Sequence, residues 1–560
     1  GVLPWRLIHF HTHMDADATD ALTALAAIWA QMRFIRLAVL VFSRGAPLTD
    51  WLRGPDRVTC ALRVSALAAL LWCIAAPSPV ALFATLTTTL ALGWACLPYE
   101  VDNSGTYGLL ADTNLWCGMC CAWATGRTAS EGWQLCAPAA RTIFVTTYCF
   151  AAFAKLNSGY ADVRKSSCTV FTCFVGEGFV PAAVTRRVLA LLGDRATLAF
   201  LEVGLVTLKA VEIAIPPLLT FGDLRGAALV LWVFHLLLGS IAYDYSVISM
   251  ASLILCAPPA LVLRLSWMSS APLARLVFTA TALAGCWRLD AQRCRELGSC
   301  EHVLSLLWLC LLCPASWIPA GTSTPPGLLA LPPLPLPFAA CGTALLLLTL
   351  LNGLGPYLGY KTAATWAMFS NLHVEGGWTN HWLVPASWQL CGMAADLVTV
   401  VDSDVELIRD YHTHSCFGAT FEGNDVSPLQ AFARRCGIRC VSHANSVLGR
   451  GGDVSVVLPF RVPFWQLRRL ISLEALPTRR DFHVEYIATS EPAVPPAGGE
   501  GASGGKGPGG RRRRFEVRGG RIVGDSDRRL AAPPCWLLAK LIYFKSVLPA
   551  DRDCGVCHGP

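Results

Sequence analysis

A lysine closes a long apolar run, and its position allows acid–base chemistry. Lys155 ends the predicted span 136–156 in the string Phe150-Ala-Ala-Phe-Ala-Lys-Leu-Asn157. Near the end of a membrane helix, a lysine can extend its amine to the lipid headgroups. If the lysine points into a helical bundle instead, desolvation disfavours the ammonium form and leaves an amine that can act as a base. The sequence alone leaves both roles open.

A histidine lies deep in a second apolar run. His235 belongs to the string Trp232-Val-Phe-His-Leu within the predicted span 226–242. A neutral histidine can simply form a hydrogen bond to a neighbouring helix. It can also carry a proton or bind a polar ligand. Tyr243, Asp244 and Tyr245 follow about two helical turns later, and we expect them to line the mouth of the same cavity.

Three charged residues share one predicted helix. Glu202, Lys209 and Glu212 are seven and three residues apart within 197–221, which puts them near one helical face. A structural pair between Lys209 and Glu212 is the simpler interpretation. The alternative is a polar pathway through the bilayer, because ionisable groups at membrane depth usually face a cavity or a partner.

Three further patterns have less specific interpretations. The segment 366–385 is rich in Trp and broken by Gly, which suits a membrane interface or a cap over a substrate cavity. His9, His11 and His13 alternate near the start, without the carboxylates or thiols of a metal site, so we predict no metal. The string Cys554-Gly-Val-Cys-His558 matches the short haem-attachment pattern, but without a surrounding fold we assign it no function.

The composition explains why these polar residues stand out. Of the 560 residues, 54% are hydrophobic and only 15% are charged, against about 25% charged in typical soluble domains. A crossing needs about 20 apolar residues. We therefore predict an all-α polytopic membrane bundle with about eight transmembrane helices. The apolar runs are 61–76, 80–97, 106–125, 136–156, 197–221, 226–242, 244–263, 303–319 and 338–354.

The chain is expected to divide into five consecutive parts. Residues 20–43 within the N-terminal segment 1–60 form the first apolar helix. Gln31, Arg33 and Arg36 interrupt it, so an interfacial helix is the alternative to a spanning one. The membrane domain is 61–390, and a soluble, β-containing tail covers 391–492. A Gly/Pro/Arg linker, 493–514, is expected to be disordered, with an arginine run suited to solvent or to anionic headgroups. Residues 515–560 complete the tail with a strand and an amphipathic helix at 535–547.

The order of several short motifs resembles a known family. Phe153-Ala-Lys-Leu-Asn157, Ser166-Ser-Cys168, Glu212, and Arg225 before Phe234-His235 resemble the membrane domain of the vitamin K-dependent gamma-carboxylase superfamily. That superfamily includes the horizontally transferred transmembrane (HTTM) domain proteins. The stretches 352–362 and 368–371 are more similar to the HTTM-like branch. The resemblance covers about residues 60–385.

The resemblance implies a reaction and a set of site residues. In the carboxylase the matching lysine is the base that starts oxidation of vitamin K hydroquinone. Lys155 would then be the base, and His235 would line the quinol cavity. Asn103 stands where the carboxylase has a histidine before a Tyr-Gly-Leu-Leu run, which argues against full gamma-carboxylation. The implied substrate-binding residues are Asn103, Tyr107, Asn157, Glu212 and Tyr243.

Several functional alternatives therefore stay open. The first is a quinol or lipid-phase redox enzyme, with reduced vitamin K or another quinol as its cofactor. The second is a transporter or channel that uses Glu202, Lys209, Glu212 and His235, and the third is a non-catalytic membrane anchor. The expected partners are the lipid bilayer and an apolar quinone or lipid ligand. The formal net charge of +7 is too mild to predict nucleic-acid binding.

Overall fold

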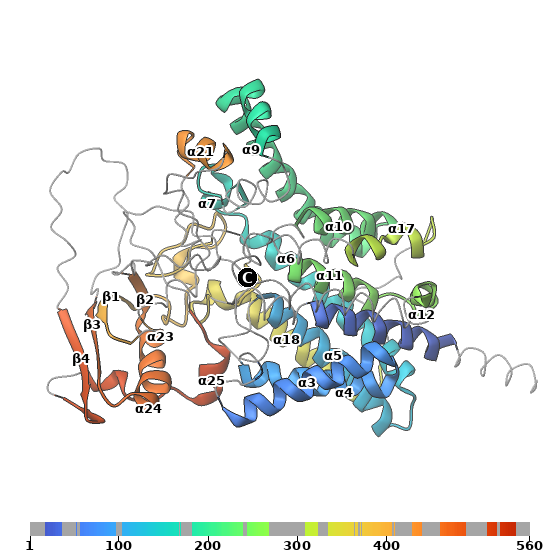
Figure 1. Ribbon diagram of the computed structural model, residues 1–560, viewed down its shortest axis with the longest axis horizontal. Helices are drawn as coiled ribbons and strands as arrows, with labels where there is room; N and C mark the ends of the chain where they lie inside the picture. Colours follow the sequence, from blue (N-terminus) through green and yellow to red (C-terminus); the bar gives the residue numbers. More distant parts are fainter. Residues whose placement is uncertain are drawn as a thin grey trace, which may run out of the picture. The chain divides into compact units, whose positions relative to one another are not determined.

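The computed structural model divides the chain into two compact units (Figure 1). One unit contains residues 1–149 and 210–350, and the other contains 150–209 and 351–560. The predictions for 9–13, 493–511 and 554–558 lie outside the described residues. The structure describes residues 17–35, 52, 56–96, 103–166, 168–169, 182–238, 243–267, 308–322, 334–362, 364–367, 370, 372–405, 408, 428–438, 460–488, 512–523 and 527–544.

The described chain is mostly helical, and four of its helices are long and apolar enough to cross a membrane. They are α3 (Arg57–Ala75), α4 (Pro79–Cys96), α6 (Ala129–Ala154) and α18 (Leu336–Leu358). Helices α10 (Leu224–Leu238) and α11 (Tyr243–Leu255) are apolar, but they have 15 and 13 residues, short of the ~20 that a crossing needs. The predicted total of eight crossings therefore stays a prediction.

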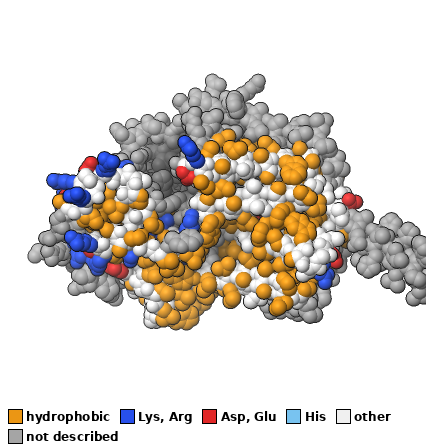
Figure 2. Space-filling model, turned by 90° about the horizontal axis from the view of Figure 1, so that it is seen from below, with side chains coloured by type: hydrophobic (Ala, Val, Ile, Leu, Met, Phe, Trp, Pro, Cys, Tyr) orange, Lys and Arg blue, Asp and Glu red, His pale blue; other side chains and the backbone are white. Residues whose placement is uncertain are grey.

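The four candidate spans differ in how much of each is covered by protein. Only 22% of the apolar window of α4 is buried, whereas 61% of the window of α6 is. Most of the exposed remainder of α4 is apolar, which suits contact with lipid. Figure 2 shows a broad area of hydrophobic side chains, with Lys and Arg side chains gathered at the left of the view. Helix α6 is instead a core helix, which lets it present side chains to several neighbours.

The first unit is a set of packed helices. Helix α3 packs on α4, α4 on α5 (Asn103–Ala124), α5 on α11, and α11 on α10. Figure 1 shows α3, α4 and α5 side by side. The helix over residues 17–35 is buried from Ala21 to Ile35 except at Thr23. Arg33 turns inward and lies 2.5 Å from Asp112, and the interfacial position of this helix stays a prediction.

Helix α9 (Ala182–Phe221) begins 15 residues before the predicted span 197–221. The helix bends at Gly193, where φ is +71° and ψ is 167°. Glycine accepts this conformation without the steric cost that a Cβ would add. Helical backbone continues on both sides of the bend, so α9 includes charged residues that precede the predicted apolar run.

The tail contains a five-stranded antiparallel sheet in the order β2-β1-β3-β4-β5. The strands are β1 (Leu397–Ser403), β2 (Phe460–Pro463), β3 (Phe482–Ala488), β4 (Arg512–Arg518) and β5 (Arg521–Ile522). The prediction of a β-containing tail is confirmed. Strand β3 pairs with β4 from Phe482–Val517 to Ile487–Arg512, so the two predicted tail segments share one sheet. Figure 1 shows α23 (Phe464–Arg469) beside these strands.

The arginine run begins a strand inside the predicted linker. Strand β4 starts at Arg512, three residues before the predicted boundary at 515. Arg512 and Arg514 both contact the carboxylate of Glu485 on β3, and Arg513 lies 3.0 Å from Asp527. These contacts neutralise charges that made the run look like solvated linker. The small helix predicted at 535–547 is α25 (Trp536–Leu541).

Candidate functional site

The Lys155 amine is buried directly after α6. The side chain is 3% exposed. Its Nζ lies 3.5 Å from the carbonyl oxygen of Ala151 and 5.8 Å from the ring centre of Tyr160. Burial supports the inward orientation over headgroup contact. An amine in this setting has lost most of its contact with water.

Asn157 holds the chain in place beyond this lysine. Its Nδ2 donates to the carbonyl oxygen of Ala154 at 2.7 Å and to that of Ser370. Its Oδ1 accepts from the amide of Tyr160 at 2.8 Å and from Nδ2 of Asn380 at 3.3 Å. These bonds use both donors and both acceptor positions of the amide. Asn157 therefore positions the Lys155 turn, and its predicted contact with substrate stays a prediction.

Residues 372–384, which we name the cover segment, pair with the chain around Lys155. The amide of Trp382 donates to Leu156 at 2.9 Å, and the amide of Ser158 donates to Asn380 at 3.1 Å. Leu372, Val374 and Val384 are buried in one cluster with Ala154. The segment read in the sequence as a possible cap thus closes over the end of α6.

His381 of the cover segment is a site residue that the sequence reading missed. Its Nδ1 accepts from the amides of Leu383 and Val384 at 3.1 and 3.2 Å, so Nε2 carries the proton and donates to Phe153 at 2.9 Å. Burial lowers the pKa of His381, and the bond to Phe153 only partly opposes this. A neutral ring therefore fixes the backbone two residues before Lys155. Its partners are backbone amides, which give no sequence signal.

A second, partly buried lysine follows α18. Lys361 donates from Nζ to Oδ1 of Asn352 at 2.6 Å. Burial lowers the pKa of Lys361 to about 8. Both residues belong to the 352–362 stretch that carries the HTTM-like resemblance, but only their contact distinguishes Lys361 from an ordinary surface lysine.

His235 lies in the other unit, in a fully buried polar chain. Its Nε2 bonds to the hydroxyl of Tyr148, and its Nδ1 lies 3.1 Å from Oγ of Ser246. The ring of Tyr245 is 5.6 Å from the imidazole, centre to centre. Both ring nitrogens thus meet hydroxyl groups, which can either donate or accept a proton.

Three predicted residues gather around Tyr245 in this unit. The ring of Tyr107 lies 6.4 Å from that of Tyr245, and the ring of His235 lies 5.6 Å from it. Glu212 is 8% exposed and acts electrostatically on Tyr245. Asn103 and Tyr243 begin α5 and α11, and their side chains lie outside the described residues. Lys155 and Asn157 belong to the other unit.

The remaining members of the predicted polar pathway diverge. Glu202 is exposed. The Nζ of Lys209 lies over the ring of Trp382 at 4.3 Å, a cation–π contact. In the part of the chain that the structure describes, no three His, Cys, Asp or Glu side chains form a metal-binding group.

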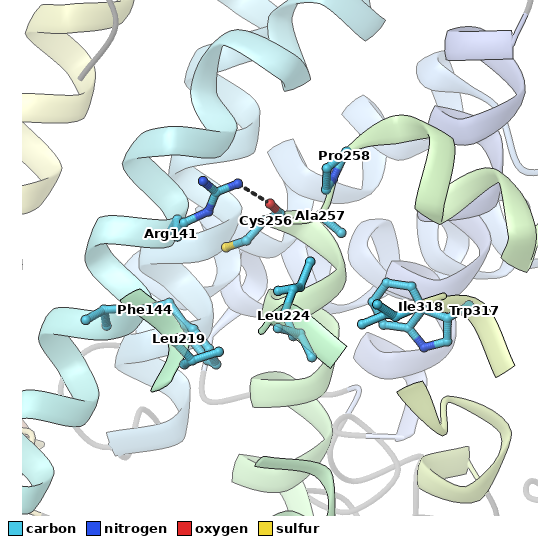
Figure 3. Close-up of a pocket in the computed structure, with 11 residues that line it drawn as sticks. Arg141, Phe144, Leu219, Leu224, Cys256, Ala257, Pro258, Trp317 and Ile318 are labelled. Carbon is cyan, nitrogen blue, oxygen red and sulfur yellow. Dashed lines mark hydrogen bonds between the residues drawn. The ribbon is translucent and has the colours of Figure 1, made fainter. Parts of the chain in front are cut away.

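Arg141 is the second residue that the sequence reading missed. It projects from the middle of α6 into a small cavity of about 20 Å³ (Figure 3). Its Nη2 donates to the carbonyl oxygen of Cys256 at 2.9 Å. Arg141 lies within the predicted span 136–156, so an arginine inside an apolar window was a signal available in the sequence.

No protein-family model, curated protein or solved structure matches this chain. The fold and sites define a mostly helical protein with four candidate membrane-spanning helices and a C-terminal antiparallel sheet. The resemblance to the carboxylase and HTTM superfamily stays a prediction that rests on the motifs quoted above.

Proposed function

We propose that this protein is a multi-pass membrane enzyme of the carboxylase/HTTM kind that uses Lys155 as a base. Its substrate is an apolar molecule with a weakly acidic hydroxyl, such as a quinol. The observation that carries the proposal is the buried Lys155 amine at the end of a candidate membrane-spanning helix. The reaction and the class of substrate come from the family resemblance.

The chemistry of the surroundings fits such a substrate. Phe153 and Tyr357 pack with ring centres 5.4 Å apart, and Tyr160 lies near the amine. These rings offer flat apolar faces of the kind that hold aromatic ligands. The Nζ lone pair of Lys155 accepts the hydroxyl proton, and the resulting ammonium stabilises the phenolate oxygen. A bound quinol would then supply the electrons for reaction with oxygen.

Quinol-dependent oxygen consumption tests this role of Lys155. The full chain, purified in detergent, is given a reduced quinone, and oxygen uptake is followed with an electrode. Replacing Lys155 by methionine keeps the apolar stem and removes the base, so we expect activity to fall by about 10²–10⁴-fold, the usual contribution of general base catalysis.

Lys165→Met is the matched control. Lys165 lies 3.9 Å from Asp162 on the surface, with 38% of its side chain exposed, so its loss should leave oxygen uptake unchanged. Both variants are first checked for the unfolding midpoint of the wild type. Equal uptake by folded wild type and folded Lys155→Met, or no uptake by the wild type with any quinol tried, contradicts the proposal.

A second candidate function is proton transfer through the first unit. The polar chain from Glu212 through Tyr245 and Tyr148 to His235 favours it, because each member can pass a proton to a hydroxyl or ring neighbour. Liposomes containing the full chain and a trapped pH dye would show proton entry under a potassium diffusion potential. His235→Phe should abolish that entry, and Lys155→Met should not.

A further inference from the structure

The Arg141 cavity lies inside the first unit and is lined mainly by apolar groups. Its lining includes Phe144 of α6, Leu219 of α9, Leu224 of α10 and Trp317 of α17 (Pro314–Trp317). Arg141 is the single charged member of that lining. Figure 3 shows its guanidinium directed at the Cys256 carbonyl, just beyond the end of α11.

The charge of Arg141 is only partly compensated. A guanidinium has five N–H donors, and the contact with Cys256 occupies one of them. The carbonyl belongs to the negative end of the α11 dipole, which is worth only about half an elementary charge. Among the described residues that line the cavity there is no Asp or Glu. An arginine in the middle of a membrane helix is energetically costly unless a partner offsets its charge.

A comparison within the same unit shows what is missing. Arg33 is buried, whereas Arg141 is half-buried, and Asp112 supplies Arg33 with a carboxylate at 2.5 Å. Both arginines belong to apolar helices, and only Arg33 has a carboxylate from the chain in the described residues. An external anion would complete the environment of Arg141 in the way that Asp112 completes that of Arg33.

The size of the cavity limits what part of a ligand enters it. Its volume of about 20 Å³ exceeds the roughly 10–15 Å³ that one water needs. It can accept one or two oxygen atoms of a headgroup, but it leaves no room for a hydrocarbon chain or a quinone ring. The apolar rim of Phe144, Leu219, Leu224 and Trp317 suits a chain that leaves the cavity toward lipid.

We infer that the Arg141 cavity binds the oxyanion of an amphipathic lipid, with the oxygen atoms on the guanidinium and the acyl chain along the apolar rim. A free fatty acid carboxylate and a lipid phosphate share this chemistry, because both accept charge-assisted hydrogen bonds from arginine. Water alone would solvate the N–H groups without balancing the charge. The inference is independent of the proposed role of Lys155.

Lipid-dependent thermal stability tests this inference. The full chain in nonionic detergent is mixed with oleate, with dioleoyl phosphatidate, or with the uncharged methyl oleate and dioleoylglycerol. Binding to the folded state raises the unfolding midpoint. We expect oleate or phosphatidate, or both, to raise the midpoint well above the effect of the matching uncharged lipid. A shift with oleate alone identifies a fatty acid site, and a shift with phosphatidate alone identifies a phospholipid site.

Three variants separate the site from general lipid effects. Arg141→Leu should weaken the apparent affinity for the active anion at least about tenfold, the loss of one charged hydrogen bond. Ala257→Val narrows the cavity while keeping the arginine and should also weaken binding. Arg127→Leu removes an exposed arginine beside Glu131 and should leave affinity unchanged. The inference fails if anions and uncharged lipids act alike, or if Arg141→Leu and Ala257→Val both bind as the wild type does.

Discussion

Two aspartates of this protein accept similar hydrogen bonds in opposite surroundings. Asp112 in the helical unit binds Arg33 and the indole Nε1 of Trp29, the latter at 2.8 Å. Asp527 in the tail binds Arg513 at 3.0 Å and Arg529 at 2.6 Å, with the hydroxyl of Tyr486 at 2.9 Å. Each carboxylate thus has arginine and one aromatic donor.

The difference lies in the arginines. The side chain of Arg33 is 9% exposed, whereas those of Arg513 and Arg529 are 39% and 64% exposed. If the carboxylate is lost, water can solvate the tail arginines, but it cannot reach Arg33. Breaking the aspartate–arginine pair should therefore destabilise the helical unit more than the tail. Burial, and not contact distance, sets the free-energy cost of breaking such a pair.

The largest effect is expected for Asp112→Asn. This change leaves the Arg33 charge buried without a counter-ion, and it should destabilise the first unit by about 3–5 kcal/mol. Unfolding of the detergent-purified chain, followed by loss of helical circular dichroism with heating, measures the loss. The double variant Arg33→Met with Asp112→Leu removes both charges and should regain much of the stability. If Asp112→Asn unfolds at the wild-type temperature, the distinction between the two aspartates is wrong.

A smaller effect is expected for Asp527→Asn, about 1 kcal/mol, because its arginines are largely solvated. Hydrogen bonds from Arg529 and Tyr486 hold the pKa of Asp527 well below its usual range, although burial opposes them. The ionised form is thus favoured by folding. Its stabilisation is complete above the usual carboxyl pKa and is lost as the pH falls from there toward the depressed value.

Hydrogen exchange of strands β3 and β4 in the full chain measures this loss. The wild type should lose protection between mildly acidic and strongly acidic pH, and Asp527→Asn should show a smaller change over the same range. Tyr486→Phe keeps the carboxylate and serves as the control for the acid response, since its arginine contacts remain. If the wild type and Asp527→Asn lose protection over the same pH range to the same extent, ionised Asp527 does not stabilise the tail sheet.

The sequence was informative wherever a feature depends on neighbouring residues. The tail at 391–492 was predicted to contain strands and includes β3, and apolar runs locate α3, α4, α6 and α18 with ends that differ by up to seven residues. Features created by contacts between distant segments were not visible. The arginine run forms a strand that pairs with β3, where Arg514 lies opposite Glu485. The composition of the run by itself is also typical of a disordered linker, so it did not predict this pairing.

The same distinction applies to the candidate sites: some were predictable from neighbouring residues, and others depend on contacts between distant segments. The burial of Lys155 was one of two readings of an apolar run, and the cover segment was read as a possible cap before its contacts were known. His381 and the Arg141 cavity needed the fold. The cavity beside Arg141 is lined by residues of α6, α9, α10 and α11, so it exists only once these helices pack together. The spacing of residues within α6 cannot predict that packing.

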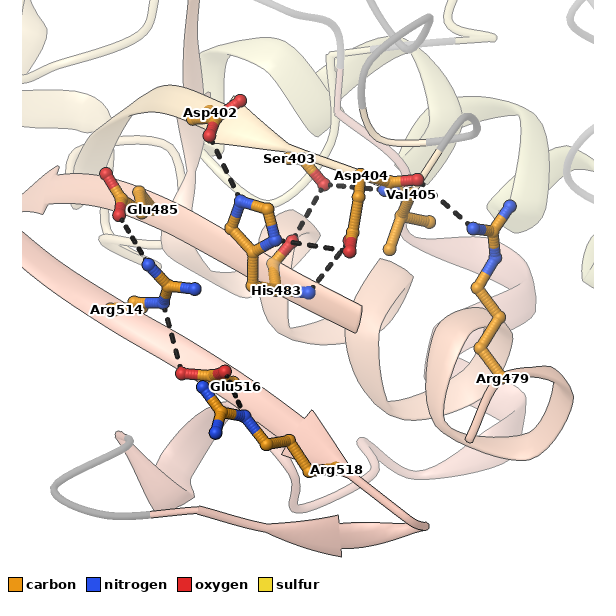
Figure 4. Close-up of polar contacts among 10 residues, drawn as sticks. All are labelled: Asp402, Ser403, Asp404, Val405, Arg479, His483, Glu485, Arg514, Glu516 and Arg518. Carbon is orange, nitrogen blue, oxygen red and sulfur yellow. Dashed lines mark hydrogen bonds and ion pairs between the residues drawn. The ribbon is translucent and has the colours of Figure 1, made fainter. Parts of the chain in front are cut away.

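The smallest effect concerns His483, which contacts two carboxylates on the open face of the tail sheet (Figure 4). Its Nε2 lies 3.0 Å from Asp402 and its Nδ1 lies 3.1 Å from Asp404. Burial works against the charged ring, but the two carboxylates outweigh it and raise the pKa of His483. Folding therefore favours the protonated form. That stabilisation is complete below the usual histidine pKa and is lost as the pH rises through the raised value.

Because Asp402 and Asp404 are about half exposed, the gain should stay below about 1 kcal/mol. Hydrogen exchange of β1 and β3 amides, corrected for the intrinsic effect of pH, should show more protection at mildly acidic than at mildly alkaline pH. His483→Gln keeps one hydrogen bond and removes the titration, so its protection should not vary. Here acid strengthens the sheet, whereas strong acid weakens it at Asp527. A wild type that gains protection as the pH rises would reverse this sign and show that the carboxylates do not hold a proton on His483.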